Sequence, residues 1–173
     1  MSFANPLPLS LLVLAGMAAA LGGAWAFQLI GYVPCELCLQ QREAYYLAIP
    51  LAALAALALT AGWASCVWRG LMTAVALAMV STALLGVYHA GAEWGFWAGP
   101  ESCGAAANAL PTSADNLLQS LSSTVPPSCT EAAGRFLGIS FAGWNVIAAA
   151  VLAYGAALAA TSDTLRSRAV ATS

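Results

Sequence analysis

Four of the five cysteines in this chain form two pairs that are suited to redox chemistry. Cys35 and Cys38 belong to a Cys-Glu-Leu-Cys motif, which lies in a short polar stretch between two apolar runs. Cys103 and Cys129 lie in the only long polar segment of the chain. Dithiols exchange with disulfides, so two such pairs on one face of a membrane would form a relay for disulfide chemistry.

The composition indicates that most of the chain is buried in a lipid bilayer. Of the 173 residues, 61% are hydrophobic, 7% are charged and none is lysine. A soluble domain carries about 25% charged residues, so this chain has too few to cover a water-exposed surface. The five basic residues also exclude a nucleic-acid-binding surface.

Four uncharged apolar runs each reach the ~20 residues that a membrane-spanning helix needs. We therefore predict an all-α membrane protein of one domain, residues 1–173. It would be a four-helix transmembrane bundle with two extracytoplasmic loops, of which the second is long and carries a short helix. The predicted spans are 9–30, 45–62, 70–90 and 141–162, and the predicted catalytic loops are 31–41 and 91–140.

The first apolar run, 9–30, differs from a signal peptide. It is longer than the ~7–15 residues of a signal core, and no lysine or arginine precedes it. Ala24-Trp25-Ala26 has the spacing of a cleavage site, but that spacing is common in an alanine-rich chain. We expect an uncleaved membrane anchor, and cleavage would leave the later topology unchanged.

The arginines predict the orientation. Arg69, Arg166 and Arg168 follow the second and fourth spans, whereas Arg42 and Arg135 lie on the other side of the membrane. Because positive charge is retained inside, three arginines against two favour cytoplasmic termini and an external position for both cysteine pairs. In a bacterium that external side is the periplasm, where disulfides persist.

The long loop 91–140 has two recognisable features. Trp94, Phe96 and Trp97 suit the level of the lipid headgroups. Residues 111–123 are predicted to form the short helix, with three leucines on one face. That face would lie either on the membrane or over the helical bundle, and the sequence leaves both open.

The spacing of the cysteines distinguishes among the sites that they could form: a haem site, a zinc site, inert disulfides or a redox site. Cys66 stands alone at the cytoplasmic side, and we expect it to be a small buried apolar residue. A c-type haem is excluded because Leu39 stands where the motif needs histidine. A structural zinc site is disfavoured because 25 residues separate the cysteines of the second pair. Two inert disulfides remain an alternative, but Cys-x-x-Cys closes a very small loop and is typical of redox sites.

Redox energetics favour a strong electron acceptor. Structural disulfides lie below about −300 mV, and strongly oxidising periplasmic thiol oxidases lie near −120 mV. That difference of about 180 mV is about 8 kcal/mol for two electrons, which a stable disulfide does not supply unaided. The chain has no flavin or haem motif. We therefore expect a lipid-soluble acceptor, and a membrane quinone is the natural candidate.

Arg42 and His89 are the candidate quinone-binding residues. Arg42 follows Cys38 by one helical turn, where its charge would stabilise a thiolate and the negative charge that develops on a quinone. Alternatively, it is an interfacial anchor paired with Glu36 or Glu43. His89, at the outer end of the third span, would donate a hydrogen bond or proton to the quinone, or serve only as an interfacial hydrogen-bonding group.

With these residues the chain resembles the DsbB family of bacterial disulfide bond formation proteins over nearly its whole length. The resemblance implies a four-helix bundle of the inner membrane that reoxidises a periplasmic DsbA-like protein and reduces ubiquinone or menaquinone. The matching elements are Cys35 and Cys38 with Gln41-Arg42, Tyr88-His89-Ala90-Gly91, Trp94, Gly99-Pro100, Cys103, Cys129 and residues 136–140.

The resemblance also implies a role for each cysteine. Cys103 receives the attack of the reduced partner, and the released Cys129 attacks the Cys35–Cys38 disulfide at Cys35. Cys38 becomes the thiolate that contacts the quinone. Glu36 lies between the two cysteines, and its charge should disfavour that thiolate.

Arg42 matches the quinone-site arginine of the family, whereas His89 matches less closely, with Glu93 as its expected neighbour on the same helix face. We expect no metal site. Two alternatives remain. A VKOR-like quinone reductase would carry its loop cysteines before the Cys-x-x-Cys motif, and here they follow it. A non-enzymatic four-span protein with a disulfide-stapled loop would be indifferent to quinone.

Overall fold

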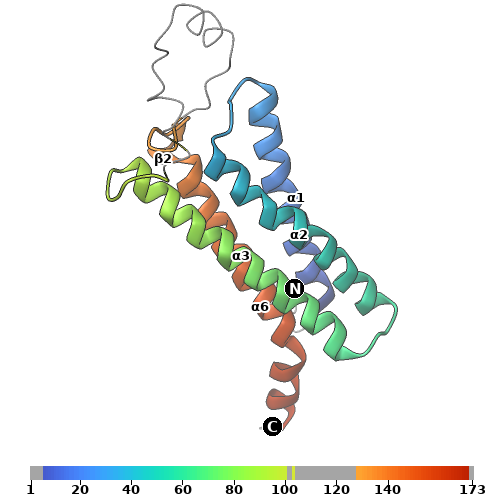
Figure 1. Ribbon diagram of the computed structural model, residues 1–173. Coiled ribbons are helices and arrows are strands. Elements are labelled where there is room, and N and C mark those ends of the chain that lie inside the picture. Colours follow the sequence, from blue (N-terminus) through green and yellow to red (C-terminus); the bar gives the residue numbers. More distant parts are fainter. Residues whose placement is uncertain (1–5, 101–102, 104–127, 172–173) are drawn as a thin grey trace, which may run out of the picture.

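The computed structural model describes residues 6–100, 103 and 128–171. Four long helices and one short hairpin make up this part of the chain (Figure 1). Each helix is long and apolar enough to cross a membrane, which confirms the prediction of an all-α four-helix bundle. The short helix predicted at 111–123 lies outside the described residues. The elements are α1 (Pro6–Leu29), α2 (Glu36–Thr60), α3 (Ser65–Glu93), β1 (Arg135–Phe136), β2 (Ile139–Ser140) and α6 (Phe141–Ala171).

The start of α2 corrects the sequence-based bounds. The helix begins at Glu36 rather than at residue 45, so residues 36–41, predicted as loop, are helical. Cys35 is the N-cap residue, and its sulfur accepts a hydrogen bond of 3.2 Å from the backbone amide of Cys38. A capped amide and an acidic residue in the first turn both stabilise a helix N-terminus. The helix therefore extends through the polar stretch that carries the first cysteine pair.

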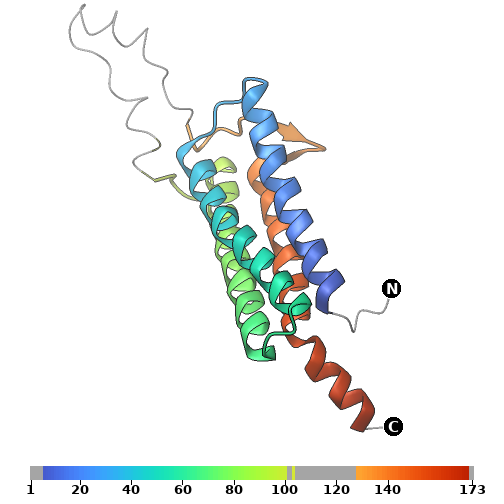
Figure 2. The same cartoon turned by 90° about the vertical axis from the view of Figure 1, so that its right-hand side faces the viewer.

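The four helices form a closed ring in which α1 and α3 each contact both α2 and α6. Figure 2 shows that the start of α1, the α2–α3 turn and the end of α6 lie at one end of the bundle. The α1–α2 connection and the β1–β2 hairpin lie at the opposite end. Both segments that carry the cysteine pairs therefore emerge at the same end.

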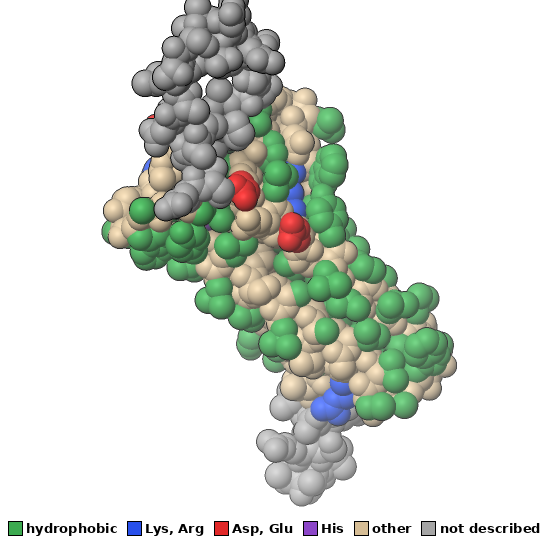
Figure 3. All heavy atoms as spheres, viewed as in Figure 1, with side chains coloured by type: hydrophobic (Ala, Val, Ile, Leu, Met, Phe, Trp, Pro, Cys, Tyr) green, Lys and Arg blue, Asp and Glu red, His purple; other side chains and the backbone are tan. Residues whose placement is uncertain are grey.

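The interior of the bundle is filled by small and flexible side chains. Met17, Met72 and Met79 are fully buried, together with alanines along α2 and α6. At Gly86, an added Cβ would lie 2.8 Å from the Cγ2 atom of Val146, so only glycine allows α3 and α6 to approach so closely. Large apolar side chains instead cover the outer flank (Figure 3), as expected for a surface in contact with lipid.

Cys66 corrects another expectation. Its side chain is exposed rather than buried. It lies in the first turn of α3 and faces away from the helical interior. In a membrane-spanning bundle, an apolar side chain gains little from facing the interior rather than the lipid, so its apolar character did not indicate burial.

The hairpin before α6 was not predicted from the sequence. Its strands pair antiparallel, with Arg135 opposite Ser140, and its turn places Leu137 at φ 52° and Gly138 at φ 81°. The Ser140 hydroxyl then accepts a hydrogen bond of 3.2 Å from the Gly143 amide, which caps the start of α6. The hairpin thus fixes how the chain enters α6 after the second cysteine pair.

The aromatic segment that follows α3 folds back onto that helix. The indole nitrogen of Trp97 donates a hydrogen bond of 2.8 Å to the carbonyl of Tyr88, and the two rings stack. An added Cβ at Gly91 would overlap the Trp97 ring, so this position requires glycine. The contact directs the chain toward Cys103 over the end of the bundle.

Candidate active site

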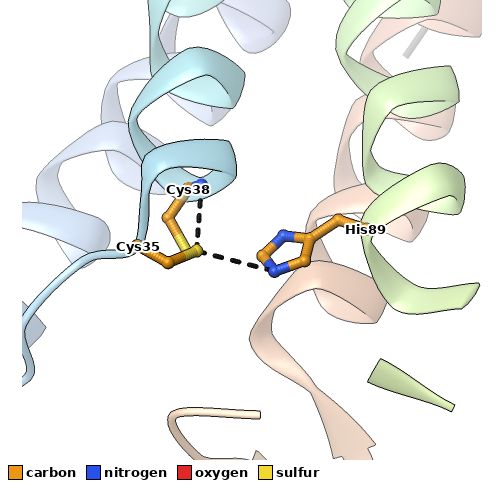
Figure 4. A group of neighbouring side chains, drawn as sticks. All are labelled: Cys35, Cys38 and His89. Carbon is orange, nitrogen blue, oxygen red and sulfur yellow. Dashed lines mark hydrogen bonds between the residues drawn. The ribbon is translucent and has the colours of Figure 1, made fainter. Parts of the chain in front are cut away.

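The first cysteine pair lies at the N-terminus of α2, facing α3. Cys35 and Cys38 are not bonded to each other, and Cys35 is buried. His89 of α3 points its ring toward this pair, with its Nε2 atom 3.5 Å from the Cys35 sulfur (Figure 4). The cap geometry described above places the two cysteines one turn apart on the same end of the helix.

The second pair is oxidised and packs against the first. Cys103 and Cys129 form a disulfide with a Cα–Cα distance of 5.4 Å. Cys129 is fully buried and shares one apolar cluster with Cys35 and Leu37, against which Cys38 and Cys103 also pack. The fold therefore brings together all four cysteines that the sequence analysis selected, with one pair as a disulfide and the other as a dithiol.

The surroundings of Cys35 favour its protonated form. A hydrogen bond from its thiol to the Cys38 sulfur, followed by burial and by the nearby charges of Cys38 and Glu93, raises the pKa of Cys35 well above the usual value of a thiol. Of the two cysteines, Cys35 is thus the one that retains its proton.

His89 is held by a chain of hydrogen bonds that crosses the bundle. The Tyr45 hydroxyl donates to the Asn145 carbonyl oxygen at 2.7 Å, and the Asn145 amide donates to the Gln41 carbonyl oxygen at 2.7 Å. The Gln41 amide is then 2.8 Å from Nδ1 of His89. Because Nδ1 accepts from this amide, the ring hydrogen lies on Nε2, which faces Cys35.

Sequence reasoning missed most of this chain. Gln41 was noted only as part of a motif, and Tyr45, Thr82 and Asn145 were not selected. The Thr82 hydroxyl donates a hydrogen bond of 2.9 Å to the backbone carbonyl of Gln41 and lies 3.4 Å from the Asn145 side-chain amide. Their polarity could have indicated the hydrogen-bond chain, because polar side chains within apolar spans usually face one another across helices.

Glu93 lies beside His89, as expected from their spacing of four residues. Its Oε1 atom is 3.6 Å from Nε2 of His89, and its side chain is only 4% exposed. Its other carboxylate oxygen has no hydrogen-bond partner among the residues that the structure describes. The site therefore contains a buried carboxylate with one unsatisfied oxygen next to the dithiol.

A cavity of about 350 Å³ opens next to Cys38 between α1, α2 and α6. Its polar lining includes Cys38, Arg42 and His89, and its walls are largely aromatic and aliphatic. The aromatic lining residues are Phe27, Tyr32, Tyr45, Phe141 and Trp144. Both predicted quinone-binding residues thus line one cavity together with one cysteine of the first pair.

Arg42 is oriented by α1. Its guanidinium donates a hydrogen bond of 2.7 Å to the Gln28 side chain and one of 3.3 Å to the Ala24 carbonyl. These contacts replace the pairing with Glu36 or Glu43 that the anchor hypothesis considered. An arginine held by neutral acceptors keeps its full charge available to the cavity.

Comparison with known proteins identifies one family. The family model described as disulfide bond formation protein DsbB matches residues 7–159, a range that includes all six predicted site residues. No curated protein and no solved structure matches the chain.

The hydrogen-bond chain predicts the effect of Asn145→Leu. This change leaves the Tyr45 hydroxyl and the side-chain carbonyl oxygen of Gln41 without the partners that Asn145 supplies, and each unsatisfied buried group costs about 1–3 kcal/mol. We expect a free energy of unfolding lower by at least that amount in a denaturant titration of the detergent-solubilised protein. Ile147→Leu, at a 45% exposed position of the same helix, is the control and should change it by less than about 0.5 kcal/mol. Equal stability of the two variants would contradict the network.

Proposed function

The chain belongs to the DsbB family of disulfide bond formation proteins, and on that premise we propose that it is a thiol:quinone oxidoreductase. It would reoxidise a DsbA-like dithiol protein and pass the electrons to ubiquinone or menaquinone. One observation carries this proposal. An oxidised and a reduced cysteine pair pack in one cluster, next to a cavity that Arg42 and His89 line.

We propose the following exchange steps, which the shared packing of the cysteines supports. Attack of a partner thiolate on Cys103 breaks the Cys103–Cys129 bond, forms a mixed disulfide and releases Cys129 as a thiolate. Cys129 attacks Cys35 in the Cys35–Cys38 disulfide and releases Cys38. The second partner thiol then attacks the mixed disulfide, which completes the partner's own disulfide and frees Cys103. The Cys103 thiolate attacks Cys129 in the Cys129–Cys35 bond formed in the step before, which restores the Cys103–Cys129 disulfide and leaves Cys35 and Cys38 reduced. Two electrons and two protons have moved from the partner to the first pair.

The described structure corresponds to the state at the end of these steps. Cys103 and Cys129 are joined, and Cys35 and Cys38 are free. Cys35 packs against Cys129, whereas Cys38 lines the cavity. In this arrangement Cys35 serves the exchange with the second pair, and Cys38 serves the transfer out of the protein.

The cavity residues fit a quinone ring. The volume of about 350 Å³ lies within the range of about 300–1,000 Å³ typical of small-molecule sites, and its aromatic walls suit a flat ring. A bound quinone supplies the final acceptance of two electrons and two protons. The Arg42 guanidinium would stabilise negative charge there, and His89 would supply a hydrogen bond.

We also propose that the cysteine-bearing end of the bundle faces the periplasm and that both termini are cytoplasmic. The arginine distribution supports this orientation. Arg69 lies near the start of α3, at the end of the bundle opposite the hairpin. The environment would be the bacterial inner membrane, with the redox cysteines on its oxidising side.

The orientation predicts which thiols are reached from outside the cell membrane. After reduction, a membrane-impermeant thiol reagent added to intact spheroplasts should label Cys103 and Cys129 and leave Cys66 unlabelled. Cys66 is exposed, so the membrane rather than the fold would protect it. Peptide mass spectrometry provides the measurement, and permeabilised cells, in which Cys66 should react, provide the control. Labelling of Cys66 in intact spheroplasts would reverse the orientation.

The proposed relay predicts that the Cys103–Cys129 pair oxidises the partner and that the Cys35–Cys38 pair reduces quinone. Cys103→Ser should abolish oxidation of a reduced DsbA-like protein while the Cys35–Cys38 dithiol still reduces quinone. Cys38→Ser should abolish quinone reduction while the Cys103–Cys129 disulfide still exchanges once with the partner. Cys66→Ser is the control and should leave turnover unchanged. Single-turnover partner oxidation and quinone absorbance measure the two halves. Full turnover in either variant would instead fit a structural disulfide.

The Arg42 contacts predict graded effects at the quinone site. Arg42→Leu should lower kcat/KM for quinone by about 10²–10³-fold, the usual cost of removing one charge-stabilising group. Arg42→Lys should fall between, because lysine keeps the charge and loses the planar fork that reaches Gln28 and Ala24. Steady-state quinone kinetics, normalised to folded protein, measure both variants. If Arg42 were only an anchor, Arg42→Lys would be silent and Arg42→Leu would reduce only the yield.

A further inference from the structure

The reduced pair lies in a donor set with the dimensions of a tetrahedral metal site. The sulfurs of Cys35 and Cys38 and a ring nitrogen of His89 all lie within 4.8 Å of one another, and Nε2 is 3.5 Å from the Cys35 sulfur. Zinc bonds of about 2.3 Å to sulfur and 2.0 Å to nitrogen place neighbouring ligand atoms roughly 3.5 Å apart. Figure 4 shows the three side chains converging from α2 and α3.

Glu93 lies at the edge of this donor set, which comprises Cys35, Cys38 and His89, and its carboxylate would turn toward the sulfurs to become a fourth ligand. Its Oε1 atom is 3.6 Å from the same Nε2 atom, close to the separation of nitrogen and oxygen ligands around one ion. The carboxylate is buried, and its Oε2 atom is unpartnered among the described residues. Buried charges are normally paired or coordinate metals, so this unsatisfied carboxylate is a second and independent indication of a cation site.

We propose that the Cys35–Cys38 dithiol, together with His89 and Glu93, binds one thiophilic divalent cation of the zinc class. Binding releases both thiol protons and changes no oxidation state, and the disulfide form lacks the two thiolates that it needs. Cys38 and His89 also line the cavity, which gives the ion a route to the site. A bound ion would therefore hold this pair reduced and stop electron flow through it, a consequence that rests on the proposed function.

Metal binding would rearrange the hydrogen-bond chain behind His89. Coordination through Nε2 removes the hydrogen from that atom and leaves one on Nδ1. Rotation of the Gln41 amide by half a turn would present its carbonyl oxygen to Nδ1, at the position that its nitrogen occupies at 2.8 Å. The same rotation breaks its bonds to the Leu37 carbonyl and the Asn145 amide, so those partners must rearrange when the ion binds. An oxygen acceptor of this kind behind a metal-bound histidine is the usual second-shell arrangement.

Cadmium titration of the purified full-length protein tests the site. The host is the Cys103→Ser/Cys129→Ser variant, reduced and freed of reductant, so that Cys35 and Cys38 form the only pair. We expect a thiolate-to-cadmium charge-transfer absorbance that saturates at one Cd²⁺ per chain. The same variant with Cys35 and Cys38 oxidised to a disulfide should give no charge-transfer absorbance. Cys66→Ser in the host should leave the band unchanged.

The matched variants Glu93→Gln and Glu36→Gln separate the proposed ligand from general negative charge. Both carboxylates lie near the pair, but Glu36 is on the exposed side of α2, where it accepts from Gln40 at 3.4 Å. Glu93→Gln should weaken Cd²⁺ binding at least tenfold, and Glu36→Gln less than twofold. No saturable band in the host, or equal affinities of the two variants, would overturn the site.

A second assay separates this proposal from the proposed function. Zn²⁺ at concentrations that fill the site should inhibit thiol-dependent quinone reduction by the wild-type protein, and a chelator should restore it. If quinone reduction persisted when the cation site was filled, a bound ion would not stop electron flow through the Cys35–Cys38 pair, and that part of the proposal would be wrong. Cation binding by a protein without any quinone reductase activity would contradict the proposed function and support the metal site.

Discussion

The need to satisfy polar groups inside an apolar bundle is the constraint on which the rest of the site depends. No water is available in the membrane interior, so a buried polar side chain must find its partner on another helix. Here the chain from Tyr45 through Asn145 and Gln41 to His89 connects α6 and α2 to α3. It fixes both the position of the imidazole and the atom that carries its hydrogen. The contact between His89 and Cys35 is therefore set by residues that touch neither sulfur.

The second determinant is the capped start of α2. Because the Cys35 sulfur is itself the cap, the Cys-x-x-Cys spacing becomes the first turn of the helix. One cysteine then lies at the helix end, packed against Cys129, and the other lies one turn inside, at the cavity. A single local motif thereby presents one sulfur to the second pair and the other to the cavity.

Much of the fold was predictable because long uncharged runs have few alternatives to membrane-spanning helices. The six candidate site residues were selected from the sequence because cysteine, arginine and histidine are conspicuous in it, and the fold brings the four cysteines into one cluster. The start of α2 was missed because cysteine is not among the usual N-cap residues. The Gln41–Asn145 contact was missed because it joins residues 104 positions apart, which no local pattern indicates. Cys66 was misplaced because hydrophobicity does not separate interior from lipid-facing positions.

Burial gives the proposed relay its direction. Cys129 is fully buried, whereas Cys103 is partly exposed, so a thiolate arriving from water meets the Cys103 sulfur first. The sulfur released by that attack is Cys129, which already packs in the same cluster as Cys35. Attack in the opposite order would require the partner thiolate to reach the fully buried Cys129 sulfur. The difference in exposure between two bonded cysteines thus favours transfer from the water-facing Cys103 through Cys129 to the first pair.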